Sequence, residues 1–243
     1  MEKSMSEHVA IIPDRKPTKG IVGLNAPVRQ AKRMLLSLAV LACSAGLPAQ
    51  ADGNVTTLNF AVTRNGEQIG NTLVKLQHSG DQTIAETETN IQVKIASITV
   101  YRYEQRLSEH WVGSKLAALT AVTDDNGSVH RVSATRSGDR LSVNADGKIS
   151  QVDPAMIPAN LWNVSLLGTR TALDPKDGSV MPVSVVDRGR EQLVVQGRAL
   201  TAHRYSIRTT IPHEVWYDEN QRLLKFELRG SDGSTINTTR SAT

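Results

Sequence analysis

The sequence is poor in cysteine and in aromatic residues. Its 243 residues include a single cysteine, Cys43, and only 4% Phe, Trp and Tyr. A lone cysteine cannot close a disulfide within the chain, so the folded part must be stabilised by buried apolar side chains. The scarcity of aromatic rings weighs against a stacked aromatic platform for sugars, and it leaves aliphatic residues to form most of the core.

Long hydrophobic stretches are also rare. The run MLLSLAVLACSAGL at residues 34–47 is shorter than the roughly 20 residues that a membrane-spanning helix needs. Arg29, Lys32 and Arg33 precede the run, and an Ala-Gln-Ala sequence ending at Ala51 follows it. A basic region, a short apolar core and a small-residue site are typical of a secretory signal peptide. A buried core helix is the competing and less favoured interpretation.

These features divide the chain into three predicted parts. Residues 1–33 are expected to be a non-native or unstructured extension that includes the basic signal region, and residues 34–51 the signal core and cleavage site. Residues 52–243 are expected to be a single β-rich domain. We therefore predict a periplasmic or secreted protein. Because the sequence VLAC, ending at Cys43, loosely matches a lipoprotein cleavage box, a lipid anchor at Cys43 is the alternative to cleavage after Ala51.

Without the signal region, the chain has no excess of positive or negative charge. Seven of the 28 Lys and Arg residues and three of the 24 Asp and Glu residues precede Asp52, which leaves 21 of each sign in the rest of the chain. Nucleic-acid-binding proteins usually present a basic stripe to phosphates. The basic excess of this chain belongs to the export signal, so we exclude nucleic acid as a partner.

Long segments with helical periodicity are missing as well, and alternation with period two takes their place. Leu58, Phe60 and Val62 alternate with polar neighbours, and so do the apolar residues of segments 90–95 and 224–228. Asn-Gly, Asp-Gly and Ser-Gly pairs recur between such segments and suit tight hairpin turns. The pattern predicts a mainly β fold, as an antiparallel curved sheet or half-open β-barrel with one apolar face.

Residues 152–178 depart from this alternation. Asp153-Pro154 resembles a helix start with Asp as the N-cap, and Pro158 limits such a helix to about one turn. We therefore expect a short helical or loop insertion, which either plugs one end of the sheet or forms a lid over a ligand cavity. The predicted lid residues are Met156, Ile157, Leu161 and Trp162.

The segment ITVYRYEQRLSEHWVG at residues 98–113 combines charged and aromatic side chains, which suits either a catalytic cluster or an amphipathic strand. Side chains two apart on a strand share a face. One face would carry Arg102, Glu104, Arg106 and His110. The other would carry Tyr101, Tyr103, Leu107 and Trp111. An amphipathic strand therefore explains the segment, and we predict that its apolar face lines a ligand site.

Recognisable motifs for catalysis or metal binding are missing. The chain has no G-x-S-x-G nucleophile elbow and no H-E-x-x-H sequence. The His and acidic residues that lie nearest to one another along the chain are Glu109, His110, Asp124, Asp125 and His130. Their spacing fits strand and turn positions better than a zinc site. We therefore predict no catalytic residue, no metal and no cofactor, and a protein that is not an enzyme.

Several segments together are similar to a family of exported bacterial proteins that is known as a domain of unknown function. The segments are VKIASITVYRYEQRLSEHW, TDDNGSVHRVSA, PANLWNVSLL, LDPKDGSVMPVSV and EVWYDENQRLLKFEL, so the similarity covers nearly all of the chain after the signal. It implies a Gram-negative envelope protein and brings no catalytic residues. The order of elements also resembles Lol-type lipoprotein carriers and related periplasmic lipid-binding proteins. Those are half-open β-barrels whose concave face, partly covered by a lid, holds acyl chains.

These observations predict an exported, non-catalytic envelope protein. It would bind a hydrophobic ligand, such as a lipid, an acyl chain or a lipoprotein, on the concave apolar face of its sheet. A structural or assembly factor that holds partner proteins through sheet edges is the first alternative. A hydrolase is the second, because a triad dispersed over the chain would leave no sequence motif.

Overall fold

The computed structural model describes residues 54–230 and 232–241, which all belong to one compact unit. The predictions for residues 1–33 and 34–51, including the signal peptide and the lipid anchor at Cys43, lie outside the described residues.

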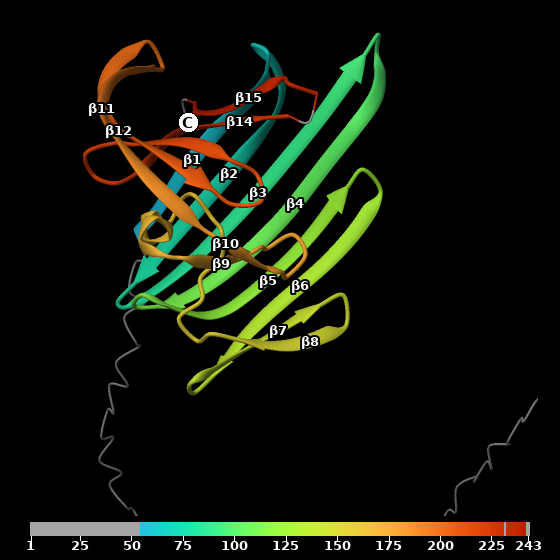
Figure 1. The fold of residues 1–243 in the computed structure, drawn as a ribbon, viewed down its shortest axis with the longest axis vertical. Helices are drawn as coiled ribbons and strands as arrows, with labels where there is room; N and C mark the ends of the chain where they lie inside the picture. Colours follow the sequence, from blue (N-terminus) through green and yellow to red (C-terminus); the bar gives the residue numbers. More distant parts are fainter. Residues whose placement is uncertain (1–53, 231, 242–243) are drawn as a thin grey trace, which may run out of the picture. The chain divides into compact units, whose positions relative to one another are not determined.

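The described chain begins with a meander of eight antiparallel strands (Figure 1). They are β1 (Asn54–Arg64), β2 (Glu67–Ser79), β3 (Gln82–Ile95), β4 (Ile98–Val112), β5 (Lys115–Asp125), β6 (Ser128–Ser137), β7 (Arg140–Ala145) and β8 (Lys148–Val152). Residues 153–183 form an insertion that contains the short 3-10 helix η1 (Val164–Gly168) and a small hairpin of β9 (Thr171–Leu173) and β10 (Val180–Pro182). The chain ends with β11 (Ser184–Val195), β12 (Arg198–Arg208), β13 (His213–Tyr217), β14 (Leu223–Arg229) and β15 (Thr235–Arg240).

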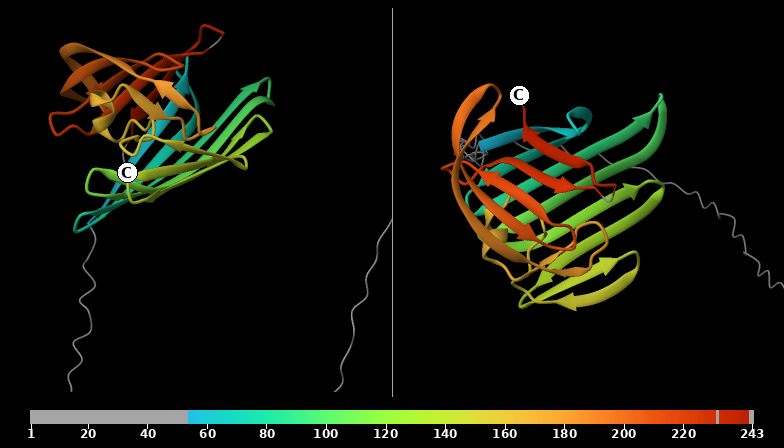
Figure 2. Two further views of the ribbon diagram at one scale, coloured as in Figure 1. Left: turned by 60° about the horizontal axis from the view of Figure 1, so that its bottom comes forward. Right: turned by 45° about the horizontal axis from the view of Figure 1, so that its top comes forward.

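All the strands except β9 and β10 belong to one antiparallel sheet of 13 strands. The last strand pairs with the first, with Phe60 opposite Arg240 and Arg64 opposite Ile236. The strand order therefore runs from β11 through β15 to β1 and on to β8. β8 and β11 are the two edges, so the sheet formed by the described residues is open. Figure 2 shows its curvature, with the insertion on the inner side between the meander and the β11–β15 strands. The predicted mainly β, antiparallel and curved fold with a short helical or loop insertion is confirmed.

Tight turns hold the meander in register. Two positive φ angles in succession, between 50° and 94°, occur at Asn65-Gly66, Asn126-Gly127 and Asp146-Gly147. Asn, Asp and Gly tolerate this backbone conformation, whose twist matches that of the strands it joins. Because each turn fixes which residues pair, it also fixes which side chains face the inner side. Leu58, Phe60 and Val62 are buried, as their alternation predicted.

The prediction that apolar side chains alternate along residues 224–228 is wrong for Leu224. The pairing of β13 with β14 shifts register between Trp216 and Tyr217, and a β-bulge of this kind interrupts the alternation of side chains. Leu224 therefore packs with Trp216 in a small separate cluster, whereas Phe226 packs against the main core.

A close approach of two backbones at Gly70 fixes the contact between β2 and β3. Gly70 lies opposite Ile91, and a Cβ at position 70 would lie 2.0 Å from the carbonyl oxygen of Asn90. Real Cβ atoms do not come so close to a backbone oxygen, so only glycine fits there without a shift of one strand.

We expect Gly70→Ala to lower the free energy of unfolding by about 1–3 kcal/mol, because the backbone of β2 or β3 must move to make room for the methyl group. Gly168→Ala is the matched control, since a Cβ at position 168 would meet no heavy atom within 4 Å. Its effect should stay within about 0.5 kcal/mol. Urea denaturation of both variants measures the difference, and equal losses of stability would contradict the close approach at Gly70.

Candidate functional site

The inner side of β4 carries the residues predicted to line a ligand site. Burial alternates along the strand, with Leu107 and Trp111 buried and Arg102, Glu104 and Arg106 exposed on the outer side. The amphipathic strand predicted for residues 98–113 is therefore confirmed. The predicted contact of its apolar face with a ligand stays a prediction.

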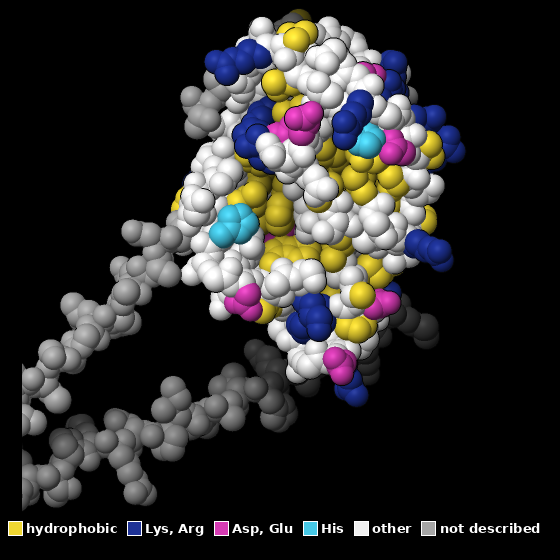
Figure 3. Space-filling model, turned by 90° about the vertical axis from the view of Figure 1, so that its left-hand side faces the viewer, with side chains coloured by type: hydrophobic (Ala, Val, Ile, Leu, Met, Phe, Trp, Pro, Cys, Tyr) yellow, Lys and Arg dark blue, Asp and Glu magenta, His cyan; other side chains and the backbone are white. Residues whose placement is uncertain are grey.

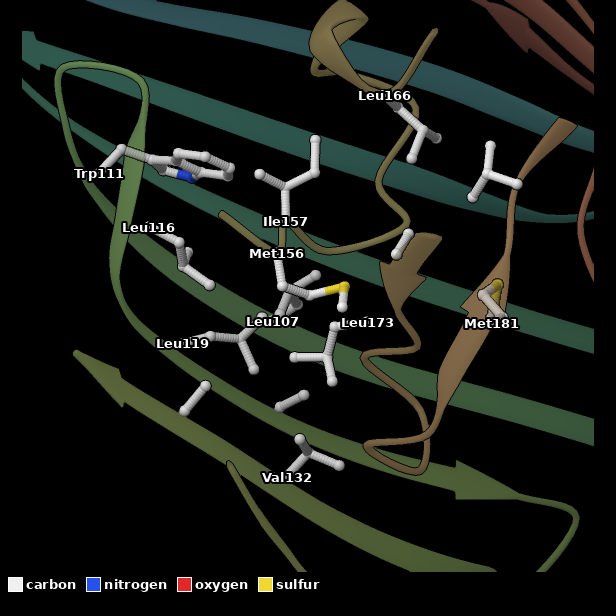
Figure 4. Packing of buried hydrophobic residues seen from close by; sticks show 14 of the residues in the cluster. Leu107, Trp111, Leu116, Leu119, Val132, Met156, Ile157, Leu166, Leu173 and Met181 are labelled. Carbon is white, nitrogen blue, oxygen red and sulfur yellow. The ribbon is translucent and has the colours of Figure 1, made fainter. Parts of the chain in front are cut away.

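The insertion packs directly on this face (Figure 4). Met156 and Ile157 are buried against Leu107, Trp111 and Leu116. Leu161 and Trp162, the other two predicted lid residues, are half-buried and pack against the same cluster. The structure thus brings six of the eight predicted site residues together, and in this conformation they fill the space between sheet and insertion.

The two remaining residues, Tyr101 and Tyr103, are half-buried nearer to the β3–β4 turn. The Tyr101 hydroxyl donates a hydrogen bond to Asp125 Oδ1 at 2.8 Å, and the same carboxylate accepts one from Lys176 Nζ of the insertion. Burial, together with the hydrogen bond to Asp125 and the charge of Asp125, raises the pKa of Tyr101 to about 12. Tyr101 therefore remains protonated at neutral pH and helps to tie the insertion to β4 and β5.

The insertion takes its shape from local caps rather than from long regular elements. The Asp153 carboxylate accepts a hydrogen bond from the Ala155 N–H, so a turn starts at Asp153-Pro154. Pro158 limits the length of this turn. The Asn163 side chain caps η1 by accepting from the Ser165 N–H. Further support comes from β13, because the Tyr217 hydroxyl donates to the Leu161 carbonyl at 2.9 Å.

Glu109 is the residue of this site that sequence reasoning missed. It has 0% exposure on the inner side of β4, between Leu107 and Trp111. Its carboxylate oxygens accept hydrogen bonds from Asn160 Nδ2 of the insertion at 2.8 Å and from Trp111 Nε1 at 3.0 Å. The parity count that sorted the neighbouring side chains also puts position 109 on the apolar face, and that was the available signal.

A second indole lies beside the Glu109 carboxyl. The rings of Trp111 and Trp162 meet edge to face, with centroids 6.1 Å apart. The Trp162 Nε1 is buried and has no partner within hydrogen-bond geometry, although it lies near enough to lower the pKa of Glu109. Burial dominates over these N–H donors and raises the pKa of Glu109 to about 7. The carboxyl therefore titrates near neutral pH.

The acidic and histidine residues that lay close together in the sequence have separate partners. His130 Nδ1 lies 2.8 Å from Asp146, Arg102 donates to Asp124 at 2.6 Å, and His110 Nε2 lies 3.1 Å from Gln82. Within residues 54–230 and 232–241, no group of three or more His, Cys, Asp or Glu side chains is placed to hold a metal ion.

A hollow of about 330 Å³ lies beside the insertion. We call it the η1 hollow, and its walls are Val164, Leu167, Arg190, Thr201, Ala202, His203, Tyr205, Tyr217, Asp218, Glu219 and Gln221. Figure 3 shows this side of the molecule, with hydrophobic side chains along a recess and charged side chains above it. Leu166 of η1 is buried in the core, whereas Val164 and Leu167 face the hollow. The single turn of η1 therefore separates the hollow from the filled core.

A chain of polar side chains borders the η1 hollow. His203 Nε2 lies 2.7 Å from Asp187 Oδ1, and His203 Nδ1 lies 3.1 Å from the Tyr205 hydroxyl. The His203 and Tyr205 rings stack with centroids 4.5 Å apart. Burial, together with the negative charge of Asp187, raises the pKa of Tyr205, so its phenol stays protonated and offers a hydrogen bond rather than a nucleophile.

We expect wild-type stability to fall relative to that of Glu109→Gln as the pH rises from 5 to 8. The pKa of Glu109 is about 7 in the folded state and about 4.5 when exposed, so the folded state holds this proton more tightly. The stabilisation that protonated Glu109 contributes is complete below pH 4.5 and is lost as the pH rises through 7. Its size is at most about 3 kcal/mol. Gln mimics the protonated carboxyl, so the variant should lack this dependence. Urea denaturation at several pH values measures it, and parallel curves for the two proteins would contradict a raised pKa.

Comparison with known proteins shows a shared fold and a family without an assigned role. A solved structure entitled "Crystal Structure of Beta-barrel-like Protein of Domain of Unknown Function DUF1849 from Brucella abortus" superposes with a TM-score of 0.57 at 9% sequence identity. The match covers 78% of this chain and 95% of that one. At this identity the likeness concerns the fold alone. No curated protein matches the sequence.

The sequence profile of a protein family matches residues 60–241, which include every described strand from within β1 to the end of β15. This agrees with the family resemblance seen in the sequence. The chain belongs to the family described as Domain of unknown function (DUF6134).

Proposed function

We propose that this protein is an exported, non-catalytic envelope protein that binds a hydrophobic ligand, such as a lipid or an acyl chain, between its sheet and its insertion. The observation that supports this most directly is the η1 hollow, a recess with apolar and polar walls that lies next to the insertion and the core beneath it. The basic and apolar residues of segment 29–51 support export.

The η1 hollow has the size of a small ligand pocket, and its walls combine apolar with polar side chains. Ligand pockets commonly measure about 300–1,000 Å³, and the hollow lies at the lower end of that range. Val164, Leu167 and Tyr217 offer apolar contacts, while Arg190 and His203 offer polar groups at the border. A longer chain needs more room than the hollow provides.

Displacement of η1 would supply that room. Because η1 separates the hollow from the core, its movement would join the hollow to the space that Ile157 and Trp162 now fill. The helix is a single turn, and two hydrogen bonds to side chains of the sheet flank it, from Asn160 to Glu109 and from Tyr217 to the Leu161 carbonyl. Short elements with few such contacts open at low free-energy cost. The insertion thus acts as a lid over the apolar face.

We expect the full chain to bind cis-parinaric acid, a fluorescent fatty acid, with a saturable rise in emission. Leu167→Glu should weaken binding at least about tenfold, because it places an unpaired charge against the apolar chain. Ile149→Glu on β8 is the control, since Ile149 is 68% exposed and does not line the η1 hollow, and it should bind like the wild type.

Thermal unfolding of the two variants verifies that both remain folded. The proposal is abandoned if the wild-type chain takes up no fatty acid and carries no lipid in native mass spectrometry. Equal affinities of Leu167→Glu and Ile149→Glu would instead place the ligand away from the η1 hollow.

The edge strands of the sheet give less support to the alternative function, that of an assembly factor which holds partner proteins. β11 is a long edge strand, but its pairing with β12 shifts register between Asp187 and Gly189. Arg188, Arg190 and Glu191 follow in the same strand. Bulges and charges of this kind prevent an edge from pairing with another chain. Ligand binding at the inner side therefore remains the better supported function.

A further inference from the structure

The hairpin of β3 and β4 extends past its neighbours in the sheet. Pairing of β2 with β3 ends at Ile91, and pairing of β4 with β5 begins at Tyr103. Residues 92–101 therefore pair only within the hairpin, and Arg102 also accepts a backbone hydrogen bond from Asn126 of the β5–β6 turn. Figures 1 and 2 show the hairpin projecting past β5 and β6. At about 3.3 Å per residue, the four residues from Gln92 to Ile95 span roughly 13 Å.

The tip of this hairpin is aliphatic and exposed. Ile95 and Ile98 pair with each other at the turn and are 61% and 69% exposed, and Val100 is also exposed. Large aliphatic side chains clustered at the end of a projecting hairpin cannot contribute to the core. Such a patch is typical of a surface that contacts another apolar phase.

The residues of this turn differ in type from those of the other turns. Seven hairpin turns connect β1 to β8, and among them only Ala96-Ser97 contains no glycine. Ala96 and Ser97 have φ angles of 48° and 70°, a left-handed conformation that disfavours a β-carbon. Asn-Gly would form this turn with less strain, and it does so at Asn65-Gly66. Strain that folding does not require indicates a functional constraint on the tip.

The charges near the tip indicate what it contacts. No acidic residue occurs from Ile91 to Tyr103, whereas Lys94 and Arg102 are present. Arg102 is paired with Asp124, and Lys94 is an exposed cation beside Ile95. Exposed aliphatic side chains beside an exposed lysine suit the surface of a bilayer with anionic phospholipids. Residues 94–100 contain no Trp, Tyr or Arg, the residues in which protein-binding hot spots are enriched.

We propose that the β3–β4 hairpin tip docks on the surface of a bilayer that contains anionic phospholipid, with Ile95 and Ile98 entering the apolar layer and Lys94 close to the headgroups. This surface is distinct from the η1 hollow, so the inference goes beyond the proposed ligand binding. Either activity can be present without the other, and each has its own measurement.

A fluorescent probe at the tip tests the docking in the full chain. Cys43→Ser/Ser97→Cys, labelled with the environment-sensitive dye NBD, should show a blue shift and stronger emission with vesicles of phosphatidylglycerol and phosphatidylcholine in equal parts. Pure phosphatidylcholine vesicles should give a weaker response, and added salt should reduce it. The control is the same probe in Cys43→Ser/Ser114→Cys, because Ser114 lies in the turn at the opposite end of β4 and should stay in water.

Vesicle flotation of unlabelled variants measures the contribution of the aliphatic side chains. Ile95→Ser/Ile98→Ser should weaken binding to the mixed vesicles at least about tenfold relative to Ile149→Ser/Val194→Ser. The control pair is matched in exposure, at 68% for each residue, and lies on β8 and β11. All four positions are exposed, so the variants should unfold at the temperature of the wild type.

Three results would overturn the proposal. The probe at position 97 could remain in water with both kinds of vesicle, or the probes at positions 97 and 114 could respond equally, which would indicate attachment through another part of the chain. The third is a tip variant that floats like its control yet loses a cross-link to a partner protein, which would make the tip a protein-docking surface.

Discussion

Burial of the inner face of the sheet by the insertion is the interaction on which the rest of this structure depends. An antiparallel sheet with one apolar face is stable in water only when something covers that face. No long helix is available, because η1 is the only helix within the described residues. Irregular chain therefore covers the face instead, with Met156, Ile157 and Leu173 buried against the strands. Since loops form few regular hydrogen bonds, their position depends on individual side chains.

Glu109 and its partners hold the insertion at the most apolar part of this interface. A carboxylate that is fully buried among neutral N–H donors is costly when ionised, and burial is the reason that its pKa lies near 7. Asn160 links this carboxyl to the insertion, so the protonation of Glu109 bears on the same contact that would change if the insertion moved. The raised pKa of Glu109 and its hydrogen bond with Asn160 thus belong to one contact between β4 and the insertion. No helix in the described residues is long and apolar enough to cross a membrane.

The two ends of β4 lie in different environments. At one end of β4, Leu107 and Trp111 are buried beneath the insertion and contribute to stability. At the other end, Ile98 and Val100 are exposed on a tip that no neighbouring strand supports. By alternation, Ile98 and Val100 share the outer face of the strand with Arg102, whereas Leu107 and Trp111 lie on the inner face. The aliphatic residues of one strand therefore lie in the core or in solvent according to the face they occupy and the part of the chain that covers it.

The sequence by itself determined the class of fold and the orientation of most strands, because period-two alternation and glycine-containing turns are local properties. The buried faces of β1 and β4 and the irregular insertion followed from those patterns. The tertiary structure alone decided what depends on distant contacts. It paired β15 with β1, and it brought Asn160 to Glu109 across 51 positions of the chain. It introduced the bulge that displaced Leu224, and it assembled the η1 hollow from four separate segments. Alternation assigns a face to each side chain, but only the packed chain determines whether that face meets core, ligand or solvent.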